Sequence, residues 1–133
     1  IDPQMPRKSF IYFETQPHFD DDRVEWWFGD VAHTLSALPE EYMLSFDLVL
    51  LEETPGVDYK EMAGLLACFL KPNGIIVQNG LVIDSLSQWF DYTAQIFYDA
   101  PTVCSQALVI GSNNVDFQEH GLFDHEIDTL VYE

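Results

Sequence analysis

The sequence has few basic residues. Its 133 residues contain 23 aspartates and glutamates but only five lysines and arginines, which gives a formal net charge of -18. A chain with this charge repels the phosphates of nucleic acids and of anionic membranes, so both are poor partners. The same charge attracts polyamines, metal ions or a basic protein surface, although an acidic surface that only keeps the protein in solution is the simpler explanation.

Cysteines and long hydrophobic runs are also scarce. The two cysteines, Cys68 and Cys104, have apolar neighbours in the sequence, which predicts small buried side chains in a reducing compartment and no disulfide framework. The longest apolar runs, such as the one around residues 48–51, are far shorter than the roughly 20 residues that a membrane span needs. We therefore expect a soluble, intracellular protein that does not insert into a membrane.

Glycine-rich and metal-binding motifs are missing. The seven glycines form no GxGxG or GxGxxG, so the tight turn that cradles a nucleotide after the first strand of many α/β proteins is absent. His18 followed by acidic residues 20–22 lacks the spacing of a calcium loop and predicts a solvated turn. The histidines and acids of residues 120–126 lack the H-E-x-x-H spacing of zinc sites. No metal site is predicted.

The hydrophobic pattern predicts one α/β domain over residues 1–133 with a polar, acidic tail from about residue 118. Strands are predicted over residues 9–14, 23–28, 46–51, 75–78, 93–98 and 105–110, and helices over residues 31–38, 57–70 and 82–90. Residues 46–51 are almost continuously apolar, which is typical of a parallel strand covered by helices on both faces. The last two strands, joined by a turn at Pro101, are expected to pair antiparallel at an edge of the sheet.

Four segments in this order resemble one protein family. Residues 23–31 (RVEWWFGDV) are similar to its "RV-x-hydrophobic-GDA" stretch, and residues 46–52 (FDLVLLE) to its "YDVIIVD" strand. Residues 70–78 (LKPNGIIVQ) are similar to its "LKPGG-hydrophobic-Q" segment, and residues 96–117 to its closing hairpin. The chain thus resembles the C-terminal portion of the spermidine synthase-like branch of the class I methyltransferase fold. The resemblance implies a partial Rossmann-like fold, with a mostly parallel sheet and a C-terminal antiparallel hairpin.

The resemblance also implies a cofactor site. Its ligand would be S-adenosylmethionine or the decarboxylated form of this cofactor. Asp30, with Val31 beside it, matches the acid that binds the adenine end, and Asp2 matches the end of the second strand, which also faces the cofactor. The alternative role for Asp30 is that of a helix N-cap, which accepts hydrogen bonds from the first amides of the following helix.

The implied substrate site departs from the family pattern. Glu52 matches the aspartate that deprotonates the attacking amine, and Gln78 and Glu53 match positions that contact the polyamine. The extra methylene of Glu52 displaces its carboxylate by roughly 1 Å, and a misplacement of that size can cost about 100-fold in rate. The loop at residues 53–56 (ETPG) is short and lacks the second aspartate that holds the polyamine. Catalysis on an amine is therefore not expected of this chain alone.

The resemblance begins in the middle of a domain, and the sequence begins with Ile1. In the family the first strand lies between the second strand and the strand that ends at Glu52, and it is missing here. We therefore expect a cut, processed or partial chain whose sheet is completed by a protein partner or by another chain segment, or a rearranged sheet. Two hypotheses remain: a non-catalytic relative that acts as a subunit or interaction module, and part of an active aminopropyltransferase or methyltransferase whose glycine-rich loop lies elsewhere.

Overall fold

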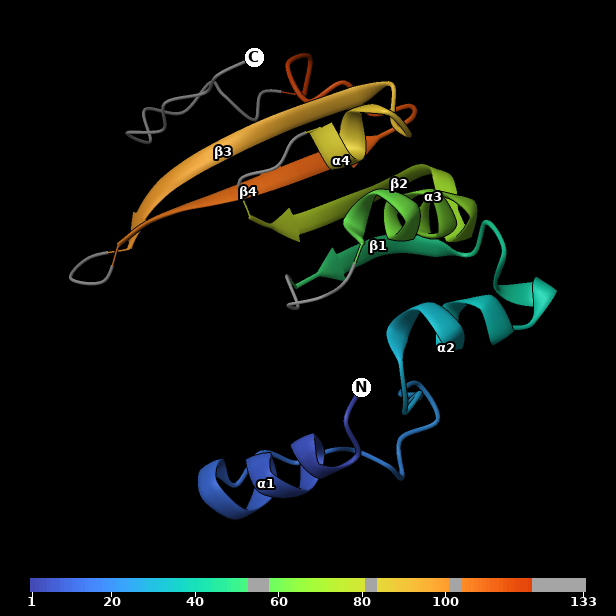
Figure 1. Ribbon diagram of the computed structural model, residues 1–133, viewed down its shortest axis with the longest axis vertical. Helices are drawn as coiled ribbons and strands as arrows, with labels where there is room; N and C mark the ends of the chain where they lie inside the picture. Colours follow the sequence, from blue (N-terminus) through green and yellow to red (C-terminus); the bar gives the residue numbers. More distant parts are fainter. Residues whose placement is uncertain (53–57, 81–83, 101–103, 121–133) are drawn as a thin grey trace. The chain divides into compact units, whose positions relative to one another are not determined.

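The computed structural model describes residues 1–52, 58–80, 84–100 and 104–120. The chain divides into two compact units, Ile1–Leu38 and Pro39–Glu133, and each is described by itself. Figure 1 shows that the first unit contains helices, whereas the second contains a sheet with helices against it. This division does not test the prediction of a single domain, and most of the predicted acidic tail lies outside the described residues.

The first unit begins with a helix where the sequence analysis predicted a strand. Helix α1 spans Gln4–Phe13, so the strand predicted over residues 9–14 is wrong. The Asp2 carboxylate accepts a hydrogen bond from the Gln4 amide at 2.8 Å, and Pro3 and Pro6 lie in the first turn, where a helix tolerates the missing N–H of proline. Glu14 ends the helix in the left-handed conformation. The prolines were helix-start signals.

Residues 23–28 form no strand either, so that prediction is also wrong. Their segment is held by side chains: Trp26 stacks on Phe28 at 6.0 Å between ring centroids, meets the edge of Phe19, and donates its indole N–H to the Pro17 carbonyl. Ile1 lies alongside the end of this segment, where it exchanges two main-chain hydrogen bonds with Gly29 and donates to the Trp27 carbonyl. A strand needs main-chain hydrogen-bond partners along its whole length, and the described residues do not supply them for residues 23–28.

The second unit contains one four-stranded sheet with the order β1-β2-β4-β3. The strands are β1 (Phe46–Leu51), β2 (Leu70–Asn79), β3 (Tyr92–Ala100) and β4 (Cys104–Ser112). β1 and β2 are parallel, whereas β4 is antiparallel to both β2 and β3. The predicted parallel pair and closing hairpin are therefore confirmed, and Pro101 lies outside the described residues.

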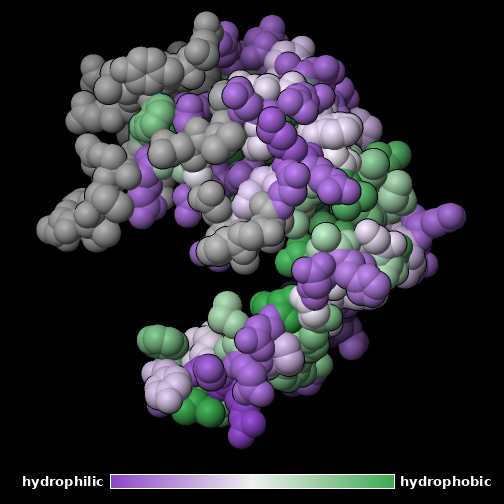
Figure 2. All heavy atoms as spheres, viewed as in Figure 1, coloured by the Kyte–Doolittle hydropathy of each residue, from purple (hydrophilic) through white to green (hydrophobic). Residues whose placement is uncertain are grey.

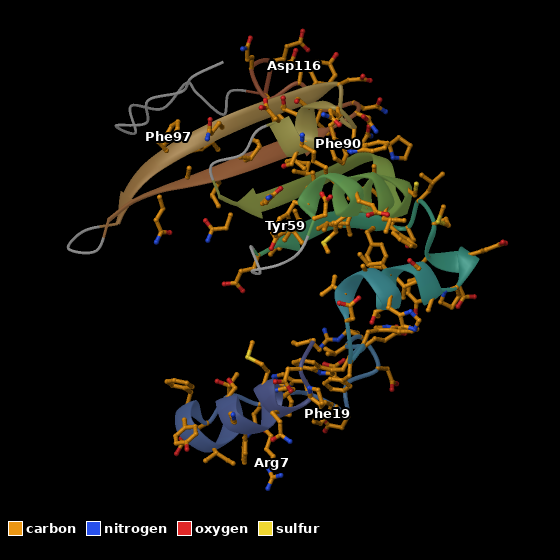
Figure 3. The ribbon with its side chains drawn as sticks, viewed as in Figure 1. Arg7, Phe19, Tyr59, Phe90, Phe97 and Asp116 are labelled. Carbon is orange, nitrogen blue, oxygen red and sulfur yellow. The ribbon has the colours of Figure 1, made fainter. Side chains whose placement is uncertain are left out.

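One face of this sheet is covered by helices α3 (Tyr59–Phe69) and α4 (Asp84–Ser87), which Figure 1 draws on the same side. Ile76 pairs with Gly111 across β2 and β4 on the covered face, and the side chains of Ile76 and of Phe90, which follows α4, both lie close to Gly111. Figure 3 labels Phe90 in this position. The core is made by buried apolar side chains of the two helices, their flanking residues and the strands: Met62, Ala63, Leu66, Phe69, Leu70, Ile76, Leu86, Phe90, Ala107 and Val109. Ile110, which pairs with Val77, is buried on the opposite face.

Two predicted boundaries in this unit are wrong. Strand β2 begins at Leu70 and not at Ile75, because Phe46 pairs with Leu70 while Leu48 pairs with Ile75, which leaves residues 71–74 as a bulge. Helix α4 is much shorter than predicted, and residues 81–83 lie outside the described part. Leu86 and Phe90 are buried, whereas Trp89 is 47% exposed. The indole of Trp89 donates to the carbonyl of Lys60 on α3.

Cys68 is exposed near the C-terminal end of α3, so the expectation that it is a buried small side chain is wrong. It lies on the outer side of the helix, where its thiol contacts the Gly64 carbonyl at 3.5 Å. The side chain of Cys104 is not among those described. The described surroundings of Cys68 give it no chemical role.

Gly74 provides a test of the bulge in β2. A Cβ at this position would lie 2.9 Å from the Lys71 carbonyl oxygen and 3.0 Å from that of Phe46, and main-chain atoms cannot move aside cheaply. We expect Gly74→Ala to lower the free energy of unfolding by about 1–3 kcal/mol, the usual cost of overpacking. Urea denaturation of the two proteins measures this change in the free energy of unfolding. The matched control is Asn73→Ala, at an exposed neighbour, for which a change within about 0.5 kcal/mol is expected. Equal stability of the two variants would contradict the bulge.

Candidate functional site

The candidate site lies where the parallel strands β1 and β2 end. Leu51, the last residue of β1, pairs with Gln78, so Glu52 and the end of β2 are neighbours on one edge of the sheet. The carboxyl ends of parallel strands are where ligands bind in open α/β sheets. The sequence analysis predicted a strand that leads to Glu52 and a strand that ends at Gln78, and the parallel pairing brings the ends of these two strands side by side.

Gln78 is buried, and its side chain already has a partner. It is 3% exposed on the helix-covered face of the sheet, and the Ser85 hydroxyl of α4 donates to its side-chain oxygen at 3.2 Å. A buried amide needs such partners, because an unsatisfied polar group costs free energy. The contact fixes α4 against the sheet and reduces what Gln78 offers to a ligand. Sequence reasoning missed Ser85, whose position seven residues after Gln78 carries no recognisable signal.

Glu52 is exposed, and the only contact described for it involves its main chain. The Tyr59 hydroxyl, at the start of α3, donates to the Glu52 carbonyl oxygen at 3.4 Å. Figure 3 labels Tyr59 in this part of the second unit. The Asp58 carboxylate caps α3 by accepting from the Lys60 and Glu61 amides. Glu52 thus presents a solvated carboxylate, which can accept hydrogen bonds from a cation. Glu53 lies outside the described residues.

The predicted cofactor residues belong to the other unit. Asp30 is the N-cap of α2 (Val31–Ala37), and its carboxylate accepts from the His33 amide at 3.0 Å, so the alternative role as a helix cap is confirmed. Val31, the first residue of that helix, is 36% exposed. The Asp2 carboxylate likewise accepts a hydrogen bond, from the Gln4 amide at the start of α1. The predicted cofactor roles of these three residues stay predictions.

Replacement of Asp30 tests its role as the cap of helix α2. Because the cap satisfies the His33 amide, Asp30→Ala is expected to destabilise α2 by about 1 kcal/mol, whereas Asp30→Ser, which can also cap, should keep most of its stability. Amide hydrogen exchange of His33 measures the effect, with fast exchange expected only in the alanine variant. Equal protection in the two variants would show that the cap contributes nothing.

The turn at residues 18–23 contains an ion pair between Asp21 and Arg23. Asp21 accepts three hydrogen bonds from Arg23, two from the guanidinium at 2.7 and 3.0 Å and one from the amide at 2.9 Å. These bonds, the side-chain ones first, hold the pKa of the Asp21 carboxyl below its usual value of 3.8. No group of three potential metal ligands occurs among the described residues.

The low pKa of Asp21 predicts the pH dependence of this turn. Because the carboxylate is favoured in the folded state, its stabilising effect is complete above pH 3.8 and is lost as the pH falls through the lowered pKa. A carboxyl-detected NMR titration should give Asp21 a midpoint below 3.8, and Arg23→Ala should move it upward. Arg7→Ala, which removes an equal charge from α1, is the control and should leave the midpoint unchanged. A midpoint insensitive to both variants would exclude the ion pair as the cause.

The fold was compared with those of solved structures. The structure of spermidine synthase from Thermotoga maritima superposes with a TM-score of 0.66 over 87% of this chain, at 16% sequence identity. That of a probable spermidine synthase from Corynebacterium glutamicum ATCC 13032 superposes with a TM-score of 0.61 over 98% of the chain, at 17% identity. The chain has a spermidine synthase-like fold. It is a partial Rossmann-like methyltransferase fold, as predicted.

The spermidine synthase-like chain is much shorter than these two proteins. It covers 43% of the Thermotoga protein and 55% of the Corynebacterium protein, so it spans about half their length. No family model and no curated protein matches the sequence. In the part of the chain that is described, no helix is long and apolar enough to cross a membrane. At these identities the likeness establishes the fold, and the function is argued from the residues.

Proposed function

We propose that this chain is a non-catalytic, spermidine synthase-like module that acts as a subunit or interaction module of a larger assembly. The observation that carries the proposal is the exposure of β1. Leu48 is 52% exposed and Leu50 is 72% exposed, although the strand is almost entirely apolar and lies at the edge of the described sheet. Full burial of one leucine stabilises a protein by about 1.5–3 kcal/mol, so a partner that covers this strand gains considerable free energy.

The hydrogen bonds of the residues that the resemblance assigns to ligand binding support the same proposal. Gln78 is bonded to Ser85, Asp30 caps α2, and Asp2 holds the first turn of α1. A ligand would have to compete with these contacts or use the oxygen atoms that remain. Each of these residues therefore has a structural reason to be present that does not require catalysis.

The length of the Glu52 side chain and the lack of a described group that orients its carboxylate also support the proposal. Where the family has an aspartate as the base, this chain has a longer glutamate, and the described residues give its carboxylate no hydrogen-bond donor to orient it. A general base needs a fixed position, because a shift of about 1 Å can cost 100-fold in rate. An exposed, unoriented carboxylate at the edge of the sheet is poorly suited to that role.

The alternative is that these residues are part of an active aminopropyltransferase or methyltransferase. The observation that favours it is the neighbouring placement of Glu52 and Gln78 at the carboxyl ends of two parallel strands, where such a site would lie. In that case the glycine-rich loop and the cofactor-binding strand that carries it would come from outside residues 1–133. S-adenosylmethionine or its decarboxylated form would then be the cofactor, and a polyamine or another acceptor the substrate.

Calorimetric titration distinguishes the two. The full-length protein that contains residues 1–133 is titrated with S-adenosylmethionine and with decarboxylated S-adenosylmethionine, with an active spermidine synthase as positive control. A non-catalytic module should give no binding tighter than about 1 mM. Micromolar binding of either compound that is weakened by Glu52→Gln or Asp30→Ala would overturn the proposal in favour of the enzyme.

A further inference from the structure

Strand β2 and the residue after it contain two asparagine–glycine pairs, Asn73–Gly74 and Asn79–Gly80. An asparagine in such a pair is open to attack on its side-chain amide carbon by the main-chain nitrogen of the glycine. Glycine favours this reaction because it has no side chain to hinder the approach and its backbone has more freedom than that of other residues. The two pairs have the same local chemistry, so their surroundings in the fold decide which of them reacts.

The pair Asn79–Gly80 is held by strand β4. Asn79 pairs with Leu108, and the Gly80 amide donates to the Ala107 carbonyl oxygen at 3.1 Å. The attacking nitrogen of this pair is therefore already a hydrogen-bond donor and has to leave the strand pairing before it can react. Local opening of a paired strand costs free energy, which slows a reaction that requires it.

The pair Asn73–Gly74 lies in the bulge of β2. Neither residue has a partner residue in the register with β1 or in the register with β4. Asn73 is exposed, so water reaches its side chain. The Ser112 hydroxyl donates to the Gly74 carbonyl oxygen at 2.9 Å, and this oxygen takes no part in the reaction. The bulge thus leaves the reacting groups of this pair outside the ladder that holds the other pair.

A hydrogen-bond donor also lies at the reacting carbonyl of Asn73. The side-chain nitrogen of Asn114 donates to the Asn73 side-chain oxygen at 3.3 Å. Negative charge develops on this oxygen when the glycine nitrogen attacks the carbon that carries it. A donor placed where charge develops lowers the free energy of the transition state. Asn114 therefore assists the attack.

We infer that Asn73 is a site of spontaneous deamidation in the folded protein. The Gly74 nitrogen forms a bond to the Asn73 side-chain carbon, the bond from that carbon to the side-chain nitrogen breaks, and ammonia leaves with the proton of the Gly74 amide. Water then opens the resulting succinimide at one of its two carbonyl carbons and gives aspartate or isoaspartate. The inference goes beyond the proposed function and does not depend on it.

The isoaspartate product changes the fold at the bulge. Its main chain runs through the former side chain and is longer by one carbon atom. The bulge has little room for this carbon, because a Cβ on Gly74 would already lie 2.9 Å from the Lys71 carbonyl oxygen and 3.0 Å from that of Phe46. Deamidation at this position therefore loosens the pairing of β1 with the start of β2 and adds a negative charge to an acidic chain.

The test incubates the full-length protein, folded and in urea, at neutral pH for several weeks. Peptide mapping by mass spectrometry follows the conversion of amide to acid at both asparagines. In the folded protein Asn73 should deamidate about tenfold faster than Asn79, because the reaction at Asn79 needs local opening. In urea the two rates should agree within about threefold, because the fold no longer distinguishes the two pairs.

Two variants test the part played by Asn114. Asn114→Ala should slow the deamidation of Asn73 about threefold, a smaller effect than that of removing a buried oxyanion donor because this donor is exposed. The matched control is Asn113→Ala, at an exposed neighbour whose side chain accepts from the Asp91 amide, and it should leave the rate unchanged. The isoaspartate form should unfold at a lower urea concentration than Asn73→Asp, which carries the same charge without the longer main chain.

Three results would count against the inference. Deamidation of Asn79 as fast as that of Asn73 in the folded protein would overturn the role of the bulge. Protection of both asparagines relative to the protein in urea would show that Asn73 is not a site in the folded state. An unchanged or faster rate in Asn114→Ala would overturn the assistance by Asn114. Each of these results leaves the adenosyl-ligand titration unaffected, so the proposed function stands or falls separately.

Discussion

The parallel pairing of β1 with β2 is the constraint on which the rest of the second unit depends. Because the two strands run in the same direction, Glu52 and Gln78 come to one edge of the sheet. Because the pairing with β2 uses one side of β1, the other side of this strand has no partner strand among the described residues. A single register therefore determines both the candidate ligand site and the edge at which Leu48 and Leu50 are exposed. Hydrophobic residues reach the surface of both units in Figure 2, so apolar exposure is not confined to the sheet.

The sequence predicted the second unit better than the first, for a physical reason. In β1, α3 and the β3–β4 hairpin, the hydrophobic period agrees with the partners that the fold supplies, so local pattern and tertiary packing act together. In the first unit they do not. Residues 23–28 have strand composition but lack a neighbouring strand among the described residues. Helix α1 contains aromatic residues typical of strands, but Asp2 and Pro3 precede it and Pro6 lies in its first turn. There the helix-start signals determined the structure and the composition did not.

The candidate site was predictable in placement and not in detail. A buried strand followed by acidic residues predicts a carboxylate at the carboxyl edge of the sheet, and Glu52 is there. The partner of Gln78 could not be predicted, because contact with Ser85 depends on where a four-residue helix packs. Similarly, an aspartate at position 30 is equally compatible with a helix cap and with a ligand contact, and the structure of the following helix was needed to show the cap. Side-chain chemistry follows from packing, which local patterns do not contain.

The open edge and the ligand site are linked by geometry. Any parallel strand that docks on β1 has its carboxyl end beside Glu52, so the residues after that strand lie against the candidate site. If those residues form a glycine-rich turn before a helix, their amides can bind a cofactor, and the edge supports catalysis. If they are bulky or basic, they fill the site and neutralise Glu52, and the same edge supports assembly. The identity of the strand that neighbours β1 therefore bears, together with Glu52 and Gln78, on the choice between an enzyme and a binding module.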